Sequence, residues 1–482
     1  FETQKTFVEG LSLATSFARG RGGVWVLNPP YLLFYSDRDG NDVPEGNPEV
    51  HLEGFGLEDS HSVANSLRWG PDGWLYACQG STVTGNVRAY GSTTKPQHSM
   101  GQLIWRYHPE TRRYEIFAEG GGNAFGIEID SRGRIYSGHN GGNTRGFHYV
   151  QGGYYQRGFG KHGALSNPHA FGYFAPMKHP DVERFTHDFV IYEDGLLPEA
   201  YRQKLFAVDP LGSRVVYSRL HATGSTFASE DVAYAVESND PWLRPAEIDV
   251  GPDGAIYVSD FYEQRIDHAS HYQGRIDRAS GRIYRLGPSE PSRESNVQHD
   301  LSSLTTTQLV ERLMATLHRW EADTLLRLLG DRHDSIAIGP LRKALHENGP
   351  FALRALWGLH LSGGLSEPQA ITLLAHPDPY VRLWTVRLVG DDRVVSEKMA
   401  KRLAQLALEE PHVEVRCQLA CSARRLGATQ GLPLVGNLAQ HDADATDPFI
   451  PLLLWWAMED AIDSDPERVL ALFDDEDFWQ LP

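Results

Sequence analysis

Cysteine is scarce in this chain of 482 residues, which has only Cys78, Cys417 and Cys421. An odd number without framework spacing excludes a disulfide scaffold, and no Cys-x-x-Cys-His segment is present to attach a haem. Cys417 and Cys421 lie at i and i+4, on the same helical stripe as Val413 and Ala420. A metal or redox role is one interpretation of this pair, and a buried core position is the commoner one.

Positive charge and long apolar runs are also lacking. Lysine and arginine number 45 against 63 acids, a formal net charge of −18, so nucleic acid is not an expected partner. No apolar run approaches the roughly 20 residues of a membrane helix. The chain opens with Phe1 rather than methionine and stops at Pro482 without a tail. We therefore expect an internal fragment, whose lack of a signal segment says nothing about export.

Turn chemistry followed by short strands is abundant. Gly-Pro-Asp-Gly occurs at 70–73 and 251–254, where proline fixes φ and glycine takes a positive φ. Turn-then-strand units recur about every 50 to 71 residues, with strands expected at 24–27, 74–77, 134–136, 204–208 and 255–258. This period predicts a β-propeller of about six blades, truncated at its N-terminus. A β-sandwich with insertions is the alternative.

The pattern changes near residue 290, where a polar linker precedes helical text. Val381, Trp384, Thr385 and Leu388 have the spacing of one helix face. Arginines at 354, 382 and 416 recur 28 and 34 residues apart, which is typical of stacked helix pairs. We predict a β-propeller at 1–287, a linker at 288–303 and an all-α HEAT-like solenoid at 304–482.

Two stretches carry a family resemblance: GFGLEDSHSVANSLRWGPDGWLYACQGS at 54–81, and the segment 242–286 with its Asp260-Phe261-Tyr262 strand end and its Gly281-Arg282-Ile283-Tyr284 strand. They resemble the bacterial membrane-bound dehydrogenase family, six-bladed propellers related to soluble quinoprotein glucose and sorbosone dehydrogenases. The resemblance runs in order from Phe7 to Leu286. Long members of the family continue into HEAT-type repeats and a c-type haem segment, which this sequence lacks. The resemblance implies export to the periplasm or cell surface.

The resemblance also implies a catalytic site. In quinoprotein sugar dehydrogenases, a histidine before the Gly-Pro-Asp-Gly turn accepts a hydroxyl proton while hydride leaves carbon for the quinone, and histidine titrates near neutral pH. His61 is the candidate base, with Asp260 and Arg278 as further catalytic candidates. Counted back from the turn, however, the dehydrogenase histidine falls on Ser62 and its orienting acid on Ser81. The alternatives are a structural role for His61 and an internal Asp–Arg network.

Glycine-rich stretches at 120–126 and 138–143 allow backbone to approach a ligand closely. Gly122 and Ala124 stand where related dehydrogenases carry an arginine and a proline. Turn formation at a blade rim is the alternative interpretation of these stretches. With the loop after residue 260, they supply the predicted quinone-lining residues, which are Asn123, His139, Asn140, Tyr262 and His268.

Oxygen-bearing side chains alternate at Asp37, Asp39 and Asn41, a pattern that suits a hard cation such as Ca²⁺. The segment lacks the glycine and glutamate placement of an EF-hand, so an acidic turn is the alternative.

Together these features predict an oxidoreductase fragment that oxidises a sugar or polyol with pyrroloquinoline quinone and Ca²⁺. Electrons would pass to a c-type haem domain or cytochrome outside this chain. The alternative is a non-catalytic propeller that binds a carbohydrate or a protein, with the HEAT-like region as an interaction scaffold.

Overall fold

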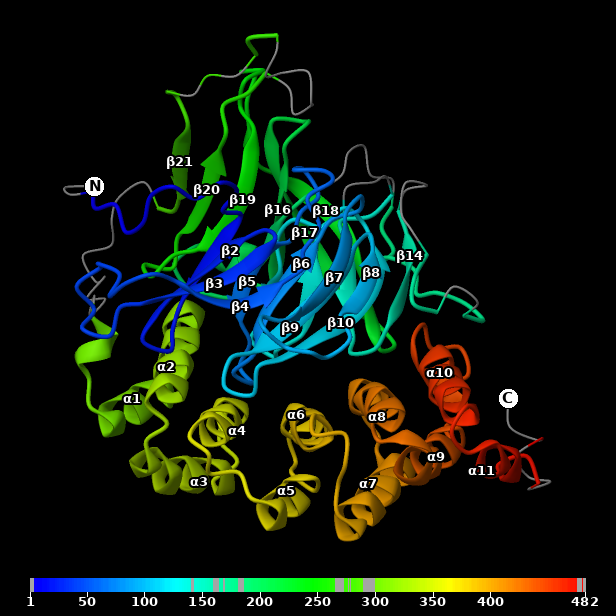
Figure 1. Ribbon diagram of the computed structural model, residues 1–482. Helices are drawn as coiled ribbons and strands as arrows, with labels where there is room; N and C mark the ends of the chain where they lie inside the picture. Colours follow the sequence, from blue (N-terminus) through cyan, green and yellow to red (C-terminus); the bar gives the residue numbers. More distant parts are fainter. Residues whose placement is uncertain are drawn as a thin grey trace.

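The computed structural model describes residues 4–139, 143–158, 164–167, 170–180, 186–264, 273–275, 277, 279–288, 300–474 and 479. Five β-sheets come first in the chain, and a helical region follows them (Figure 1). The predicted change from strands to helices is therefore confirmed. A closed ring of blades and the HEAT type of the helices remain predictions.

The strands of each sheet follow one another closely in the chain. The first sheet has the order β1-β2-β3-β4-β7-β8 and the second β14-β10-β9-β6-β5; the other three follow chain order, β11-β12-β13, β15-β16-β17-β18 and β19-β20-β21. Their bounds are β1 (Ser16–Arg19), β2 (Gly23–Asn28), β3 (Tyr31–Ser36), β4 (Glu49–Glu53), β5 (Asn65–Trp69), β6 (Leu75–Gln79), β7 (Thr84–Ala89), β8 (Gln97–Met100), β9 (Leu103–His108), β10 (Arg113–Gly121), β11 (Glu128–Ile129), β12 (Ile135–Ser137), β13 (Phe147–Tyr149), β14 (Tyr154–Arg157), β15 (Phe189–Tyr192), β16 (Lys204–Asp209), β17 (Arg214–Thr223), β18 (Thr226–Glu237), β19 (Pro245–Val250), β20 (Ile256–Asp260) and β21 (Arg282–Leu286).

Each sheet opens with a strand at its edge, namely β1, β5, β11, β15 or β19. The strands that the turn pattern predicts are the second of each sheet: β2, β6, β12, β16 and β20. Apolar and β-branched residues make these second strands suit the middle of a sheet, where both faces are covered. All six residues of β2 and all five of β6 are buried. The repeated unit is therefore a turn that leads from an edge strand into a buried one.

The helices form two rows along one side of the sheets (Figure 1). An inner row of α2 (Arg319–Arg332), α4 (Ala352–Leu361), α6 (Pro379–Gly390), α8 (Val413–Arg425) and α10 (Ile450–Ile462) faces the sheets. An outer row holds α1 (Thr306–Leu313), α3 (Ile338–His346), α5 (Glu367–Leu373), α7 (Glu397–Glu409), α9 (Gly427–Leu438) and α11 (Pro466–Ala471). The predicted starts near 378 and 412 agree with α6 and α8, and Asp378 caps α6 by accepting the Tyr380 N–H at 2.8 Å.

The inner row shares a hydrophobic core with the sheets. Tyr76, Phe117 and Phe174 from the sheet region belong to one buried cluster with Trp456 of α10, and so do Cys417 and Cys421 of α8. Cys417 and Cys421 are therefore buried core residues, which was one of the two interpretations of their spacing. The third cysteine, Cys78 on β6, is also buried in this cluster, and burial raises the pKa of its thiol far above the usual range. The surface of the helical inner row is used within the chain, against its own sheets.

Candidate functional site

His61 stands just before β5, at the strand's N-terminal end. Its imidazole is exposed, and Nδ1 lies 3.6 Å from Asp59 Oδ1. Asp59 is itself held, because Oδ1 accepts the His61 backbone N–H at 2.9 Å and Oδ2 accepts the Thr82 hydroxyl at 2.6 Å. A fixed carboxylate beside Nδ1 favours a proton on that nitrogen, which makes Nε2 the basic one. The i, i+2 spacing of Asp59 and His61 is visible in the sequence, whereas the family resemblance places the orienting acid on Ser81.

Asn123 lies directly beside His61. Its side-chain carbonyl accepts the Ser62 hydroxyl at 3.0 Å and the Ser81 backbone N–H at 2.7 Å, while its NH₂ donates to the His61 carbonyl at 3.3 Å. Ser62 and Ser81 are the two positions where the family resemblance places a base and its acid. Ser62 and Ser81 both donate to the Asn123 side chain, which therefore holds residues 61–62 in place.

His139 is buried rather than open to a ligand, since it is only 4% exposed. A Cβ added at Gly122 would lie 1.9 Å from its Nδ1, and one at Gly158 would lie 2.3 Å from its Cε1. Burial lowers the pKa of His139 to about 4, so the ring is neutral at pH 7. Gly122 and Gly158 therefore leave the space that the His139 imidazole fills.

The loop after β20 begins with a braced turn. Asp260 is buried, and its Oδ1 accepts the backbone N–H groups of Arg244 and Tyr262, both at 2.8 Å. Tyr262 has a φ of 55°, and its ring centre lies 4.0 Å from the guanidinium carbon of Arg282. These contacts brace the start of the loop, and a catalytic role for Asp260 stays a prediction. Asn140, His268 and Arg278 lie outside the described residues.

Glu263 brings this loop within electrostatic reach of His61. Burial raises the pKa of Glu263, and the charges of His61 and Arg244 oppose that rise. Of the predicted site residues that the structure describes, His61 and Asn123 are in direct contact, and the charge of His61 acts on Glu263 in the loop after β20. His139 is a buried ring.

The predicted calcium residues make contacts of their own. Asp39 accepts the backbone N–H of Asn41 at 3.2 Å and its side-chain NH₂ at 2.7 Å, and Asp37 accepts from Arg19 at 3.3 Å. A cation would have to displace these contacts. Within the described parts of the chain, no cluster of three histidine, cysteine or acidic side chains is arranged to hold a metal.

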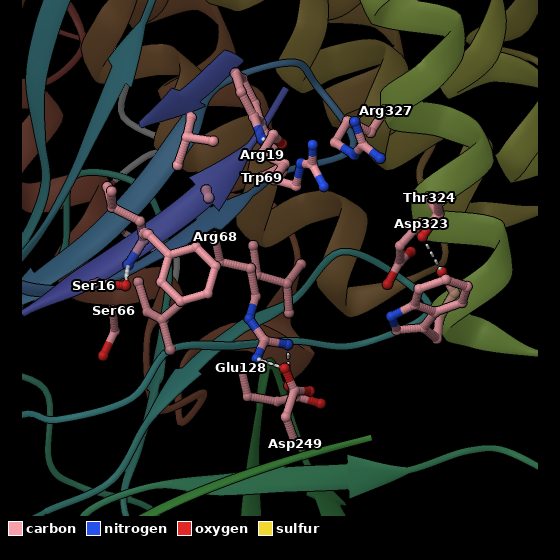
Figure 2. Close-up of a pocket in the computed structure, with 18 of the residues that line it drawn as sticks. Ser16, Arg19, Ser66, Arg68, Trp69, Glu128, Asp249, Asp323, Thr324 and Arg327 are labelled. Atoms are coloured by element: carbon pink, nitrogen blue, oxygen red, sulfur yellow. Dashed lines mark hydrogen bonds and ion pairs between the residues drawn. The ribbon is translucent and has the colours of Figure 1, made fainter. Parts of the chain in front are cut away.

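The strand β5 also borders a cavity of about 1010 Å³ (Figure 2). Ser66 to Gly70 line it, whereas His61, which precedes the strand, does not. The first strand of each described sheet (β1, β5, β11, β15 and β19) contributes residues to the wall of the cavity, and so does the inner helix α2. The sheets are therefore arranged around a common centre, which the helical region covers on one side.

Ion pairs tie the strands of this cavity to each other and to α2. Arg68 on β5 reaches Glu128 on β11 at 3.3 Å and Asp249 on β19 at 3.1 Å (Figure 2). Arg319 on α2 reaches the same Glu128 at 2.6 Å. Glu128 is 1% exposed, so its charge depends on both guanidinium groups. Nothing in the sequence pattern pointed to this cavity, because its walls come from segments as far apart in the chain as Phe7 and Leu361, which only the fold brings together.

Two further carboxylates face the cavity with weaker pairing. Glu247 and Asp323 are accessible to solvent, yet protein surrounds them on the concave wall. Burial raises the pKa of Glu247, and Asp249 raises it further against the pull of Arg68. Burial likewise raises the pKa of Asp323 to about 6, against the pull of Arg319. These carboxylates retain acceptor positions for a ligand.

This architecture defines a class of protein in which five mainly antiparallel sheets surround a ligand-sized cavity under a cover of paired helices. The chain belongs to the DUF7133 family, described as a domain of unknown function, whose model matches residues 1–290. No curated protein matches the chain. Among the described helices, none combines the length and apolar character needed to cross a bilayer.

Several solved structures are similar to part of the chain. The PQQ-bound aldose sugar dehydrogenase of Streptomyces coelicolor is 15% identical with a TM-score of 0.38, over 57% of this chain and 82% of that one. The soluble aldose sugar dehydrogenase of Escherichia coli, in its apo-form, is 12% identical with a TM-score of 0.32, over 58% and 97%. An oxidoreductase (glucose dehydrogenase) of Thermus thermophilus is 16% identical with a TM-score of 0.33, over 58% and 98%. Similarity at this level assigns no residue a role, so function rests on the contacts of the chain itself.

Proposed function

We propose that the chain is a sugar or polyol oxidoreductase that uses His61 as its base. The observation that carries the proposal is the exposed imidazole with the Asp59 carboxylate 3.6 Å from Nδ1. In this arrangement Nε2 accepts the proton of a substrate hydroxyl, and Asp59 stabilises the imidazolium that forms. Asn123 holds the segment in place through the His61 carbonyl. A base of this kind contributes a factor of about 10² to 10⁴ in rate.

A bound quinone would supply the acceptor for the hydride that leaves carbon. The acidic side chains of Asp59, Asp260 and Glu263 do not suit the carboxylates of an acid-bearing quinone, and Arg244 is engaged with Ser213 and backbone carbonyls. Arg278, the cation that the family resemblance assigns, lies outside the described residues. The proton step stands on the chain's own residues, and the quinone, Ca²⁺ at residues 37–41 and a haem partner stand on the resemblance alone. A periplasmic or cell-surface location has the same basis.

The test is reconstitution of the purified chain with pyrroloquinoline quinone and Ca²⁺, followed by dye reduction with a panel of aldoses and polyols. We expect turnover with at least one substrate and a loss of about 10²-fold or more in His61→Ala. His221→Ala is the matched control, because His221 is an exposed histidine on β17. If His61→Ala reduces dye as fast as the parent, the base is wrongly assigned.

The second candidate is a non-catalytic carbohydrate- or protein-binding protein. The observation that favours it is the packing of His139 and the bracing of Asp260, which commit two predicted site residues to structure. In that case no sugar reduces the dye, and the quinone does not stay with the protein on gel filtration. Turnover with any sugar would reject this candidate.

A further inference from the structure

The cavity under α2 is separate from the His61 end. Residues 66–69 of β5 and Gly70 after it line the cavity, and His61 lies before that strand begins. Neither His61 nor Asp59, Asn123 or Asp260 is among the residues that line it. The cavity also has a wall that the His61 end lacks, namely the polar face of α2 with Trp320, Asp323 and Arg327.

Hydrogen-bond donors with spare capacity line one part of this cavity. Arg327 donates to Asp331 through Nη1 at 3.0 Å, which leaves Nε and Nη2 without a partner among the described residues. Arg19 uses only Nη2, toward Asp37 and Asp42. Figure 2 shows Arg19 and Arg327 close to one another at the edge of the same space. Burial lowers the pKa of Arg327 and the charges of Arg19 and Arg21 lower it further, although Asp331 opposes them.

Acceptors and aromatic surface line the rest. The Glu247 carboxylate makes no hydrogen bond with the described residues, and Asp323 has only a 3.6 Å ion pair to Arg319. Trp69 and Trp320 are both partly exposed on the wall. Figure 2 shows Asp323 and Thr324 on α2 beside the space that Arg68 and Asp249 border from the strands. Hydrogen-bond donors, hydrogen-bond acceptors and tryptophan rings therefore line the same cavity.

We propose that this cavity is a second ligand site, and that it binds a short neutral oligosaccharide. Sugar hydroxyls both donate and accept, so they use guanidinium and carboxylate groups on the same ligand. The apolar face of a sugar ring buries well against indole surface, which supplies contact area as well as a polar edge. About 1010 Å³ lies at the upper end of ordinary small-molecule pockets, so it holds more than one sugar ring.

A small anion or a polyamine suits the cavity less well. Arg19, Arg21 and Arg327 already share the carboxylates of Asp37, Asp42 and Asp331, so no uncompensated positive centre remains among these described groups. A polyamine would use Glu247 and Asp323 but leave the spare arginine N–H groups unmatched. A neutral polyhydroxyl ligand satisfies both sets.

The experiment is isothermal titration of the full chain with neutral trisaccharides of glucose, mannose and xylose units, with spermidine and glucuronate as charged probes. We expect at least one trisaccharide to bind with a Kd below about 1 mM, and Asp323→Asn and Trp320→Leu each to weaken it at least about tenfold. Glu311→Gln is the matched control, since it changes an exposed carboxylate on α1 outside the cavity. His61→Ala should bind as the parent does, which separates this site from the proposed catalytic one.

Three results would overturn the proposal. One is the failure of every trisaccharide to bind at about 10 mM while the parent remains folded by circular dichroism. Another is binding of spermidine or glucuronate without any trisaccharide. The third is trisaccharide binding that survives in both cavity variants but is lost in His61→Ala. Because Asp323 is exposed and Asn has its shape, that variant retains the fold and keeps the test decisive if Trp320→Leu does not fold.

Discussion

The inner helices meet the sheets in two contrasting ways. Between α6, α8 and the second sheet the charges are sealed: Arg106 is 0% exposed and reaches Glu115 at 3.0 Å and Asp391 at 2.7 Å, under the ring of Trp74. Under α2 the charges border an open cavity and keep unused hydrogen-bonding capacity. The inner helices and the sheets thus enclose buried ion pairs at α6 and α8, the sealed junction, and border a solvent-accessible cavity at α2. We expect the buried ion pairs to hold the helices against the sheets.

The largest expected effect comes from breaking the sealed junction. Arg106→Met leaves the buried carboxylates of Asp72, Glu115 and Asp391 without their shared cation, which should cost about 3–5 kcal/mol of unfolding free energy. Urea unfolding followed by far-ultraviolet circular dichroism measures it. Arg112→Met is the control, since this half-exposed arginine lies 3.7 Å from Glu49 and should cost less than about 0.5 kcal/mol. Equal losses in the two variants would mean that the junction is not what holds the layers.

Acid should loosen the sealed junction only at pH values below those at which the cavity carboxylate Asp323 takes up its proton. Burial raises the pKa of Glu115, but Arg106 and Arg425 outweigh it and bring the pKa to about 2, from an ordinary 4.5. A carboxylate with a lowered folded pKa stabilises above its unfolded pKa, and the stabilisation is lost as pH falls from about 4.5 to about 2. We expect a loss of up to about 3 kcal/mol over this window in the parent, and a flatter profile in Glu115→Gln. A parent profile as flat as that of the variant would contradict the assignment.

A glycine tests how closely the helices approach. Gly133 has a φ of +73°, and a Cβ there would lie 2.2 Å from the Trp384 ring of α6, whose Nε1 donates to the Arg132 carbonyl at 2.7 Å. Gly91 has nearly the same φ, +72°, with nothing within 4 Å of an added Cβ. Both alanine variants carry the backbone strain, so the excess loss in Gly133→Ala, expected at about 1–3 kcal/mol, isolates the helix contact. No excess in thermal or urea unfolding would mean that α6 moves away at little cost.

The smallest effect concerns the open cavity. The pKa of Asp323 is raised to about 6, so its charge opposes folding as pH rises from its ordinary 3.8 through 6. Asp323→Asn should match the parent near pH 4 and exceed it slightly near pH 7. The side chain is 61% exposed, so solvent screening limits the gain to below about 1 kcal/mol. A variant that is less stable than the parent at pH 7 would show that the carboxylate is a structural anchor.

Local pattern predicted the parts of the fold that local chemistry determines. The Gly-Pro-Asp-Gly turns precede β6 and β20, and proline with an N-cap aspartate marks the start of α6. The sequence singled out His61 and Asn123 separately, and the structure joins them through the Asn123 NH₂ and the His61 carbonyl, while their roles stay predictions. The rest depends on tertiary contacts. The sequence does not show that Gly122 lies against the His139 ring, or that Arg319 reaches Glu128.

Arg319 couples the binding of a ligand in the cavity to the packing of α2 against the sheets. It joins α2 to Glu128 and, through its guanidinium, to the carbonyls of Ile129 and Ile191, so one wall of the pocket exists only while the helix is seated. A ligand that contacts both the strands and α2 would stabilise the packing of α2 against the sheets. By thermodynamic linkage, that packing would increase the binding free energy of the ligand by the same amount. Slower amide exchange along α2 would register such a ligand.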